Sequence, residues 1–300
     1  MKTILITGAS GLIGSHLKDL LQSKGYTTIS LSRKKSVDES VYFWNISENY
    51  IDPIAIKKAD FIIHLAGAGI ADERWTKNRK KILLESRVKT TQLLFDKINE
   101  YNPSIEGLIA ASGIGYYGTI TCDEIFTEES PCGKDFLAEI CAQWEMESLK
   151  FQKEQIRTVI FRTGIVLTSH GGALAKISWP IRHGIGAFLG KGIQYMPWIH
   201  IDDLCRLYLF AIENKKIKGI FNAIAPNHIT NKEFTTTLAK KLDRKIWLPP
   251  VPSWLLKLFY GEMSDILLKG SRISEQKISN TGFEFNYKEL MNALVSLDMK

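Results

Sequence analysis

Three glycines at three-residue spacing follow a short apolar run near the start of the chain. The segment "ITGASGLIGSHL", which begins at Ile6, contains Gly8, Gly11 and Gly14 between an expected strand and an expected helix. In this context the first glycine permits a tight turn, the second lets the backbone approach a pyrophosphate, and the third lets helix and strand pack closely. The free amides at the helix N-terminus favour an anion. The segment predicts a dinucleotide-binding turn, and a plain glycine-rich connection is the competing interpretation.

Short apolar runs then alternate with longer amphipathic stretches along the chain. Strands are expected at residues 3–7, 27–32, 61–65, 107–111, 158–162 and 220–223. Helices are expected at residues 12–24, 75–100, 135–152 and 204–214, with Asp202 or Asp203 as the N-cap of the last. This alternation predicts an α/β protein with a Rossmann-type, doubly wound parallel sheet.

The pattern loosens after residue 165, where glycines interrupt a segment rich in bulky residues. We expect residues 1–225 to form an NADP-binding Rossmann domain and residues 226–300 to form a smaller C-terminal α+β substrate lobe. Residues 166–200 are expected to contribute to that lobe. Ligands of open α/β sheets bind at the carboxyl edge of the strands, so we expect the lobe to cover that edge.

Charge and cysteine content argue against several classes of protein. The 300 residues carry a formal charge of +7, but the lysine runs are scattered, which predicts a solvated basic surface and no nucleic-acid partner. No apolar run reaches membrane-spanning length and no signal peptide is evident, so a cytoplasmic protein without a membrane partner is expected. The four cysteines lack C-x-x-C spacing, and neither a metal site nor a disulfide frame is expected.

The residues after the second expected strand favour NADP(H) over NAD(H). An NAD site places an acid near this point to bond the ribose 2′-hydroxyl, but residues 29–37 contain none and offer Ser32, Arg33, Lys34 and Lys35. A guanidinium suits a 2′-phosphate, which an acid would repel. A solvated basic turn is the alternative.

Several motifs together resemble the extended short-chain dehydrogenase/reductases, and more narrowly their atypical epimerase-family, or sugar-nucleotide-epimerase-like, branch. Besides the glycine turn they are "HLAGAGIADERW", "ESRVKTTQLL", "ASGIGYYG", "DFLAEICAQWE", "FRTGIVL" and "PWIHIDDL". The segment at about 249–296, with "PVPSWLLKLFYGEM", resembles the small tail domain of that branch. The resemblance covers nearly the whole chain and implies an NADP-binding domain with a C-terminal substrate lobe.

The resemblance also implies a set of cofactor contacts. They are Gly8, Ser10, Gly11, Leu12, Ile13, Gly14, Ser32, Arg33, Leu65, Ala66, Gly67, Arg87 and Val166. For Arg87, an arginine on a long expected helix, an exposed surface cation is the alternative to a phosphate contact.

The catalytic Tyr-x-x-x-Lys dyad of ordinary members is missing. In that dyad the lysine lowers the tyrosine pKa, so that the phenol can exchange a proton with substrate. Here Phe136 or Leu137 stands at the tyrosine position, and Ile140 or Cys141 at the lysine position. None of these side chains can perform that proton transfer.

Substitute catalytic groups are therefore sought nearby. The candidates are Tyr117, Tyr116 and Ser112, although packing of the tyrosines and a turn role for the serine are open alternatives. Further residues expected near the cleft are Lys134, Glu139, Arg74, Trp75, Trp198 and His200. Two functions remain: an NADP(H)-dependent oxidoreductase or epimerase acting on an unknown small molecule, and a non-catalytic NADP(H)-binding sensor.

Overall fold

A computed structural model describes residues 1–102 and 104–298. Eight of its strands form one sheet, and two pairs of short strands form separate small sheets. The strands are β1 (Thr3–Thr7), β2 (Thr27–Ser32), β3 (Val41–Asn45), β4 (Tyr50–Ile51), β5 (Phe61–His64), β6 (Gly107–Gly113), β7 (Ile125–Phe126), β8 (Arg157–Thr163), β9 (Ile165–Leu167), β10 (Trp198–His200), β11 (Gly219–Ala223) and β12 (Arg272–Ile273).

Helices connect most of these strands. They are α1 (Leu12–Ser23), α2 (Pro53–Lys58), α3 (Lys77–Tyr101), α4 (Phe136–Lys153), α5 (Gly172–Arg182), α6 (Ile201–Glu213), α7 (Asn231–Lys241), α8 (Ser253–Tyr260), α9 (Asp265–Leu268), α10 (Gln276–Ser279) and α11 (Leu290–Ser296). Two 3-10 turns, η1 (Ile114–Tyr117) and η2 (Gly261–Ser264), follow β6 and α8. Among the described residues, no helix combines the length and apolar character needed to cross a bilayer.

The large sheet runs in the order β11-β8-β6-β5-β1-β2-β3-β4. All neighbours are parallel except the β3–β4 pair at one edge, which is antiparallel. The chain starts in the middle at β1, adds β2 and β3 on one side, and then returns to add β5, β6, β8 and β11 on the other. The strand order therefore reverses between β1 and β5, which is the point where ligands of such sheets bind.

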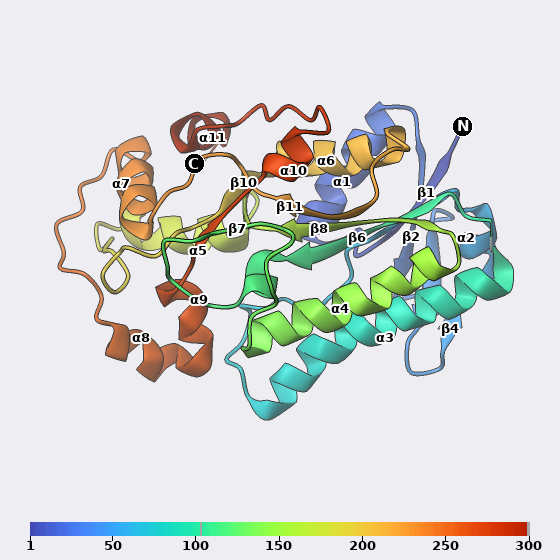
Figure 1. Ribbon diagram of the computed structural model, residues 1–300, viewed down its shortest axis with the longest axis horizontal. Helices are drawn as coiled ribbons and strands as arrows, with labels where there is room; N and C mark the ends of the chain where they lie inside the picture. Colours follow the sequence, from blue (N-terminus) through green and yellow to red (C-terminus); the bar gives the residue numbers. More distant parts are fainter. Residues whose placement is uncertain (103, 299–300) are drawn as a thin grey trace.

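Alternating side chains of the strands pack into two cores on opposite faces of the sheet. Ile4 and Ile6 of β1 join the core beneath α1 and α6, whereas Leu5 faces the core beneath α2, α3 and α4. In Figure 1, α3 and α4 cross the near side of the sheet, while α1 and α6 lie on its other side. The predicted doubly wound α/β architecture is confirmed.

A third core lies at the left of Figure 1, at the carboxyl ends of the strands. It joins residues of β9, α5 and β10 with residues of α7 and α11. The segment around 165–200 and the C-terminal residues therefore share one hydrophobic cluster. The boundary between residues 225 and 226 stays a prediction.

Two local expectations need correction. The helix expected at residues 204–214 starts at Ile201, and His200, not Asp202 or Asp203, is its N-cap: the His200 ring Nδ1 accepts from the Asp202 amide at 3.1 Å. The helix expected from Trp75 starts at Lys77, because the Thr76 side chain caps it. The short strands β3, β4, β7, β9, β10 and β12 were not anticipated; four of them have only two or three residues paired outside the main parallel sheet.

Candidate functional site

The glycine turn leaves no room for a side chain at Gly8 or at Gly14. Gly8 has a φ of 71°, and the Gly11 amide donates to its carbonyl at 2.9 Å. A Cβ on Gly14 would overlap the Gly8 carbonyl oxygen, so only glycine lets α1 pack this closely on the turn. At these two glycines the surface of the turn is therefore formed by backbone atoms.

This turn sits at the point where the strand order reverses. A Cβ built on Gly8 would lie 3.0 Å from the Leu65 carbonyl carbon and 3.1 Å from the Ala66 amide nitrogen. Leu65 and Ala66 directly follow β5, the neighbour of β1. The structure thus brings the predicted cofactor residues of both connections together at one edge.

The N-terminus of α1 has free amides. Gly11 is its N-cap without a side-chain hydrogen bond, and the first turn contains no acid. Ser10 is exposed, while Leu12 and Ile13 are half-buried. The unpaired first-turn amides and the helix dipole make this end of α1 attractive to an anion.

A buried chain of hydrogen bonds fixes the loop after β5. The Thr7 hydroxyl oxygen accepts from the amides of Leu65 at 3.1 Å and Ala66 at 3.2 Å, and lies 2.7 Å from His64 Nδ1. His64 Nε2 lies 3.0 Å from the Thr91 hydroxyl of α3. Burial lowers the pKa of His64 to about 3, so the ring is neutral. Sequence reasoning missed Thr7 and His64, since both look like ordinary strand residues.

Four consecutive backbone carbonyls beyond this loop, those of residues 68–71, each accept a hydrogen bond from a different side chain. The donors, in order, are Arg87, Arg79, Trp75 and Lys176, at 3.0, 2.7, 2.9 and 2.9 Å. Arg79 and Arg87 come from α3, and Lys176 comes from α5 on the other side of the carboxyl edge. The segment is thus fixed from both sides. Arg79 was not predicted.

Arg87 is buried, unlike the exposed surface cation that was the alternative. Its guanidinium lies 5.1 Å from the Trp144 ring centroid and 3.0 Å from a Cβ built on Gly67. Burial lowers its pKa to about 10. Among the described residues no carboxylate forms an ion pair with Arg87. A buried cation without an acidic partner, beside the loop after β5, suits an anionic ligand group.

The end of β2 is open to solvent. Ser32 is half-buried and Arg33 is exposed, and the Ser32 hydroxyl oxygen accepts from the Lys34 amide at 3.0 Å. Val166 lies in β9 opposite Ile199, and Gly172 at the start of α5 is close enough to Leu12 that an added Cβ would lie 3.0 Å from Leu12 Cδ2. The segment after β9 therefore faces the glycine turn.

The positions of the missing dyad are filled by buried apolar side chains. Leu137 and Cys141 are both 7% exposed, and burial raises the pKa of the Cys141 thiol to about 12. Phe136 packs edge-on against Trp75 with ring centroids 5.2 Å apart. The structure thus agrees with the sequence that no proton-transfer dyad stands on α4.

Ser112 is committed to a buried ion pair. Its hydroxyl donates to Glu145 Oε1 at 2.6 Å, and Glu145 accepts two further bonds, both of 2.8 Å, from the Arg162 guanidinium. Glu145 and Arg162 are almost fully buried. The Ser112 hydroxyl thus directs its proton at a carboxylate of α4, which differs from the turn role that was the alternative to catalysis.

The two tyrosines differ in their surroundings. Tyr117 is 2% exposed; its hydroxyl donates to Asn222 Oδ1 at 2.6 Å and accepts from Arg162 Nη1 at 3.0 Å. Burial raises its pKa to about 12. Tyr116 is half-buried, with its ring 3.3 Å from the Arg162 guanidinium carbon. Within the described part of the chain, its hydroxyl has no hydrogen-bond partner. The geometry favours packing for Tyr117 and leaves Tyr116 available.

The remaining cleft candidates are dispersed. Trp198 is fully buried in the third core, Lys134 is exposed, and Glu139 accepts from Gln143 on the outer face of α4. Arg74 is exposed beside Gly261 of η2. The structure therefore does not gather these residues into one catalytic group.

His200 takes part in an arrangement that only looks catalytic. Its Nε2 lies 3.1 Å from the Ser296 hydroxyl, and its Nδ1 lies 3.6 Å from an Asp202 carboxylate oxygen. Nδ1 accepts from the Asp202 amide, so in the neutral ring Nε2 carries the proton and donates to Ser296, whose hydroxyl donates to the Ala293 carbonyl. A histidine in this state cannot act as a base toward Ser296.

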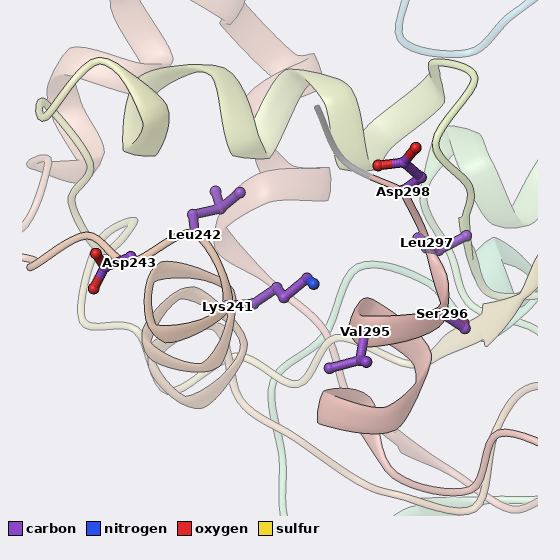
Figure 2. Close-up of a pocket in the computed structure, with 7 residues that line it drawn as sticks. All are labelled: Lys241, Leu242, Asp243, Val295, Ser296, Leu297 and Asp298. Carbon is purple, nitrogen blue, oxygen red and sulfur yellow. The ribbon is translucent and has the colours of Figure 1, made fainter.

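Ser296 also lines a hollow of about 520 Å³ between the end of α7 and the segment after α11, as Figure 2 shows. Lys241, Leu242 and Asp243 contribute one side of it. The hollow is wide open and lies away from the glycine turn. We assign no function to it.

Comparison with known proteins adds to these observations. Residues 4–223 match the model of the NAD dependent epimerase/dehydratase family, and residues 251–297 match a domain of unknown function (DUF1731). An Arabidopsis thaliana relative, "Epimerase family protein SDR39U1 homolog, chloroplastic", is 36% identical over 97% of this chain and 85% of its own length. The Bacillus subtilis epimerase family protein YfhF is 35% identical over 98% and 97% of the two chains.

Solved structures are also similar. The human epimerase family protein SDR39U1, solved with NADPH, has a TM-score of 0.89 and 30% identity, with 98% of each chain covered. The Thermotoga maritima UDP-glucose 4-epimerase, solved with UDP-glucose, has a TM-score of 0.74 at 19% identity, covering 98% of this chain and 97% of that one. The second likeness concerns the fold alone.

Proposed function

The chain belongs to the NAD-dependent epimerase/dehydratase family, and from that membership we propose that it binds NADP(H) and acts as an oxidoreductase or epimerase on a small molecule. The observation that carries the binding proposal is the contact of Gly8 with Leu65 and Ala66 where the strand order reverses. Gly8, Gly11 and Gly14 place no side chains on the turn at that edge, which lets a pyrophosphate approach closely.

The phosphate form of the cofactor is supported by charge. The exposed Arg33 follows β2 with no acid in residues 29–37, and a guanidinium can bond a 2′-phosphate through two N–H groups. The similar human protein was solved with NADPH. We therefore propose NADP(H) over NAD(H), with Ser32 and Arg33 at the 2′-phosphate.

The residues present fit the rest of such a cofactor. The α1 amides would hold the pyrophosphate. The buried Arg87, which has no acidic partner among the residues that the structure describes, would add positive charge close to it. Val166 lies on the segment that faces the glycine turn and would line the nicotinamide end. When bound, NADP(H) supplies or accepts a hydride.

The proton that accompanies hydride transfer needs a different donor from the usual dyad. Of the three predicted candidates, Tyr116 has a hydroxyl that forms no hydrogen bond within the described residues, whereas the hydroxyls of Ser112 and Tyr117 are engaged. The Arg162 guanidinium against the Tyr116 ring places a positive charge next to that phenol. We propose Tyr116 as the proton donor, acting on substrate and not on the cofactor.

One observation favours a second function. Leu137 and Cys141 make the dyad positions apolar and buried, which suits a protein that binds NADP(H) without turnover and signals its presence. Such a sensor needs the cofactor site but no proton donor.

Two measurements test the proposal. Calorimetry with NADPH and NADH should show tighter binding of NADPH. A screen for hydride transfer across carbonyl compounds and sugar nucleotides then separates the two functions: turnover with any of them supports the enzyme, and tight NADPH binding without turnover supports the sensor. Equal affinity for both cofactors would contradict the NADP(H) assignment.

A further inference from the structure

Helix α8 is apolar in sequence but barely buried. Six of its eight residues in "SWLLKLFY" are apolar and one is charged, yet Leu256 is its only buried residue in the described structure. Trp254, Leu258 and Phe259 are 67%, 63% and 66% exposed. On a helical wheel these three span one arc, with Leu256 on the other side. Its solvent side is therefore the apolar one.

The apolar surface continues next to α8. The connection from α7 runs beside the loop after α5: the Trp247 indole donates to the Gly184 carbonyl at 3.0 Å, and the Gly190 amide donates to the Val251 carbonyl at 2.9 Å. Trp247 is 71% and Ile185 is 51% exposed. We call Ile185, Trp247, Trp254, Leu258 and Phe259 the rim patch.

The rim patch lies at an outer edge of the molecule. In Figure 1, α7, its connection to α8, and α8 itself form the left edge, at the end opposite the chain's N-terminus. The elements that carry the rim patch thus form an outer border of the fold. Such a border suits a flat or deformable partner.

The charges near the rim patch favour an anionic partner. Residues 243–260 contain three cations, Arg244, Lys245 and Lys257, and one acid, Asp243. These cations are exposed beside the exposed tryptophans. Glu262 and Asp265 line the same hollow as Lys257 but form ion pairs with Lys80 and Lys269. Two copies of the chain that met through this patch would oppose cations to cations, whereas an anionic surface would attract them.

We propose that the rim patch binds the surface of an anionic lipid bilayer. Tryptophan, phenylalanine and leucine beside lysine and arginine form the side-chain set of helices that lie in the headgroup region without spanning the bilayer. This departs from the expectation of no membrane partner, which rested on the absence of a spanning run. The proposal is independent of the cofactor and of turnover.

Cosedimentation of the full chain with phosphatidylcholine vesicles, with or without phosphatidylserine, tests the proposal. Binding is expected with the anionic vesicles, accompanied by a blue shift of tryptophan emission and weakened by salt. The double variant W254S/L258S should bind at least about tenfold more weakly, since it removes two exposed apolar anchors. I54S is the matched control, because Ile54 is an exposed apolar residue of α2, 52% exposed and remote in sequence.

The outcomes separate the possible occupants. No binding to anionic vesicles, or equal binding by the wild type and W254S/L258S, overturns the proposal. A dimer in light scattering that W254S/L258S dissolves, without vesicle binding, overturns it in favour of a second copy of the chain. R244Q/K245Q should weaken vesicle binding, because it removes two of the three cations beside the rim patch. It should leave NADPH affinity unchanged, because neither cation is among the proposed cofactor contacts.

Discussion

At the residue scale, exposure decides which cation can select the cofactor and which can only support it. Arg33 is exposed just after β2, and within the described part of the chain it has no hydrogen bond or ion pair to lose when it contacts a ligand. Arg87 is buried and already donates to the carbonyls of Leu83 and Ala68. Selectivity for the 2′-phosphate should therefore depend on Arg33.

Replacing Arg33 with alanine should weaken NADPH binding about ten- to a hundredfold, because one charge-assisted contact contributes about 1.5–3 kcal/mol. NADH, which has no 2′-phosphate, should bind as before. Calorimetry with both cofactors measures the difference. K35A, which removes another exposed cation of the same turn, is the control; an equal loss for both cofactors in R33A would show that Arg33 does not contact the 2′-phosphate.

The two adjacent tyrosines make a second test. Tyr117→Phe removes the hydrogen bond to Asn222 Oδ1 and leaves Arg162 Nη1 with its long bond of 3.4 Å to the Glu128 carbonyl, so it should lower the free energy of unfolding by about 1–3 kcal/mol. Tyr116→Phe should leave stability within about 0.5 kcal/mol and, once turnover is found, reduce kcat at least about tenfold while NADPH affinity stays within about twofold.

Urea unfolding and steady-state kinetics of the two variants separate these roles. If Tyr117→Phe reduces kcat without affecting stability, the assignment of the two tyrosines is reversed. If neither variant changes kcat, neither tyrosine takes part in the mechanism.

The residue scale also shows where sequence patterns stop being informative. The glycine turn was predictable because three glycines at fixed spacing leave few backbone solutions. The commitment of Ser112 to Glu145 was not, because it joins β6 to α4, 33 residues apart, and depends on burial that spacing does not encode. Arg79 was not predicted either, because its hydrogen-bond acceptor is a backbone carbonyl, which no residue type marks in the sequence.

At the element scale, the long elements were predictable and the short ones were not. Strands β1 and β2 match the expected ranges, because a buried parallel strand is a continuous apolar run bounded by turn residues. Strands β9 and β10 have three residues each, too few to show a period. The start of α6 was misplaced by three residues because a histidine ring took the capping role expected of an aspartate.

The turn between β1 and α1 provides a matched pair of variants. Gly11 has a φ of −79°, and an added Cβ would lie 3.2 Å from the Gly8 carbonyl oxygen, so Gly11→Val should fold but place a side chain where a pyrophosphate would bind. We expect NADPH binding to be lost with little change in stability. Gly14→Val should lose both NADPH binding and stability, because its Cβ would overlap the Gly8 carbonyl oxygen.

Circular dichroism melts and calorimetry of G11V and G14V distinguish these effects. A folded G11V that binds NADPH normally would show that the turn is not the phosphate site. A G14V variant as stable as the wild type would mean that α1 can move away from the turn.

At the scale of the whole molecule, the carboxyl edge of the sheet is where the parts meet. Lys176 of α5 donates to the Ala71 carbonyl, and Lys80 of α3 pairs with Glu262 of η2 at 2.5 Å. The C-terminal segment therefore contacts the loop and helix that follow β5. The division into domains stays a prediction from the change in sequence pattern. These cross-connections could not be predicted from the sequence, since each joins residues about a hundred or more positions apart.

Stability of the whole fold should depend on pH through its buried histidines. His64 has an ordinary pKa of 6.5 that burial lowers to about 3, and burial also lowers the pKa of His200. Between those two values for His64, the unfolded chain binds a proton that the folded chain excludes. The contribution of the neutral histidine to stability is therefore fully present above about pH 6.5. It is lost as the pH falls, by up to about 1.4 kcal/mol per pH unit for one histidine.

Urea unfolding at pH 7, 6 and 5 measures this slope above the range in which carboxylates titrate. His64→Gln is the informative control, because glutamine keeps one acceptor for the Thr7 hydroxyl and one donor for Thr91 but cannot take up a proton. We expect the variant to be less stable than the wild type at pH 7. On acidification its free energy of unfolding should fall less steeply, by up to about 1.4 kcal/mol per pH unit. The same slope in both proteins would mean that His64 is not held neutral in the fold. A buried, uncharged ring would then not be what fixes the loop beside the glycine turn.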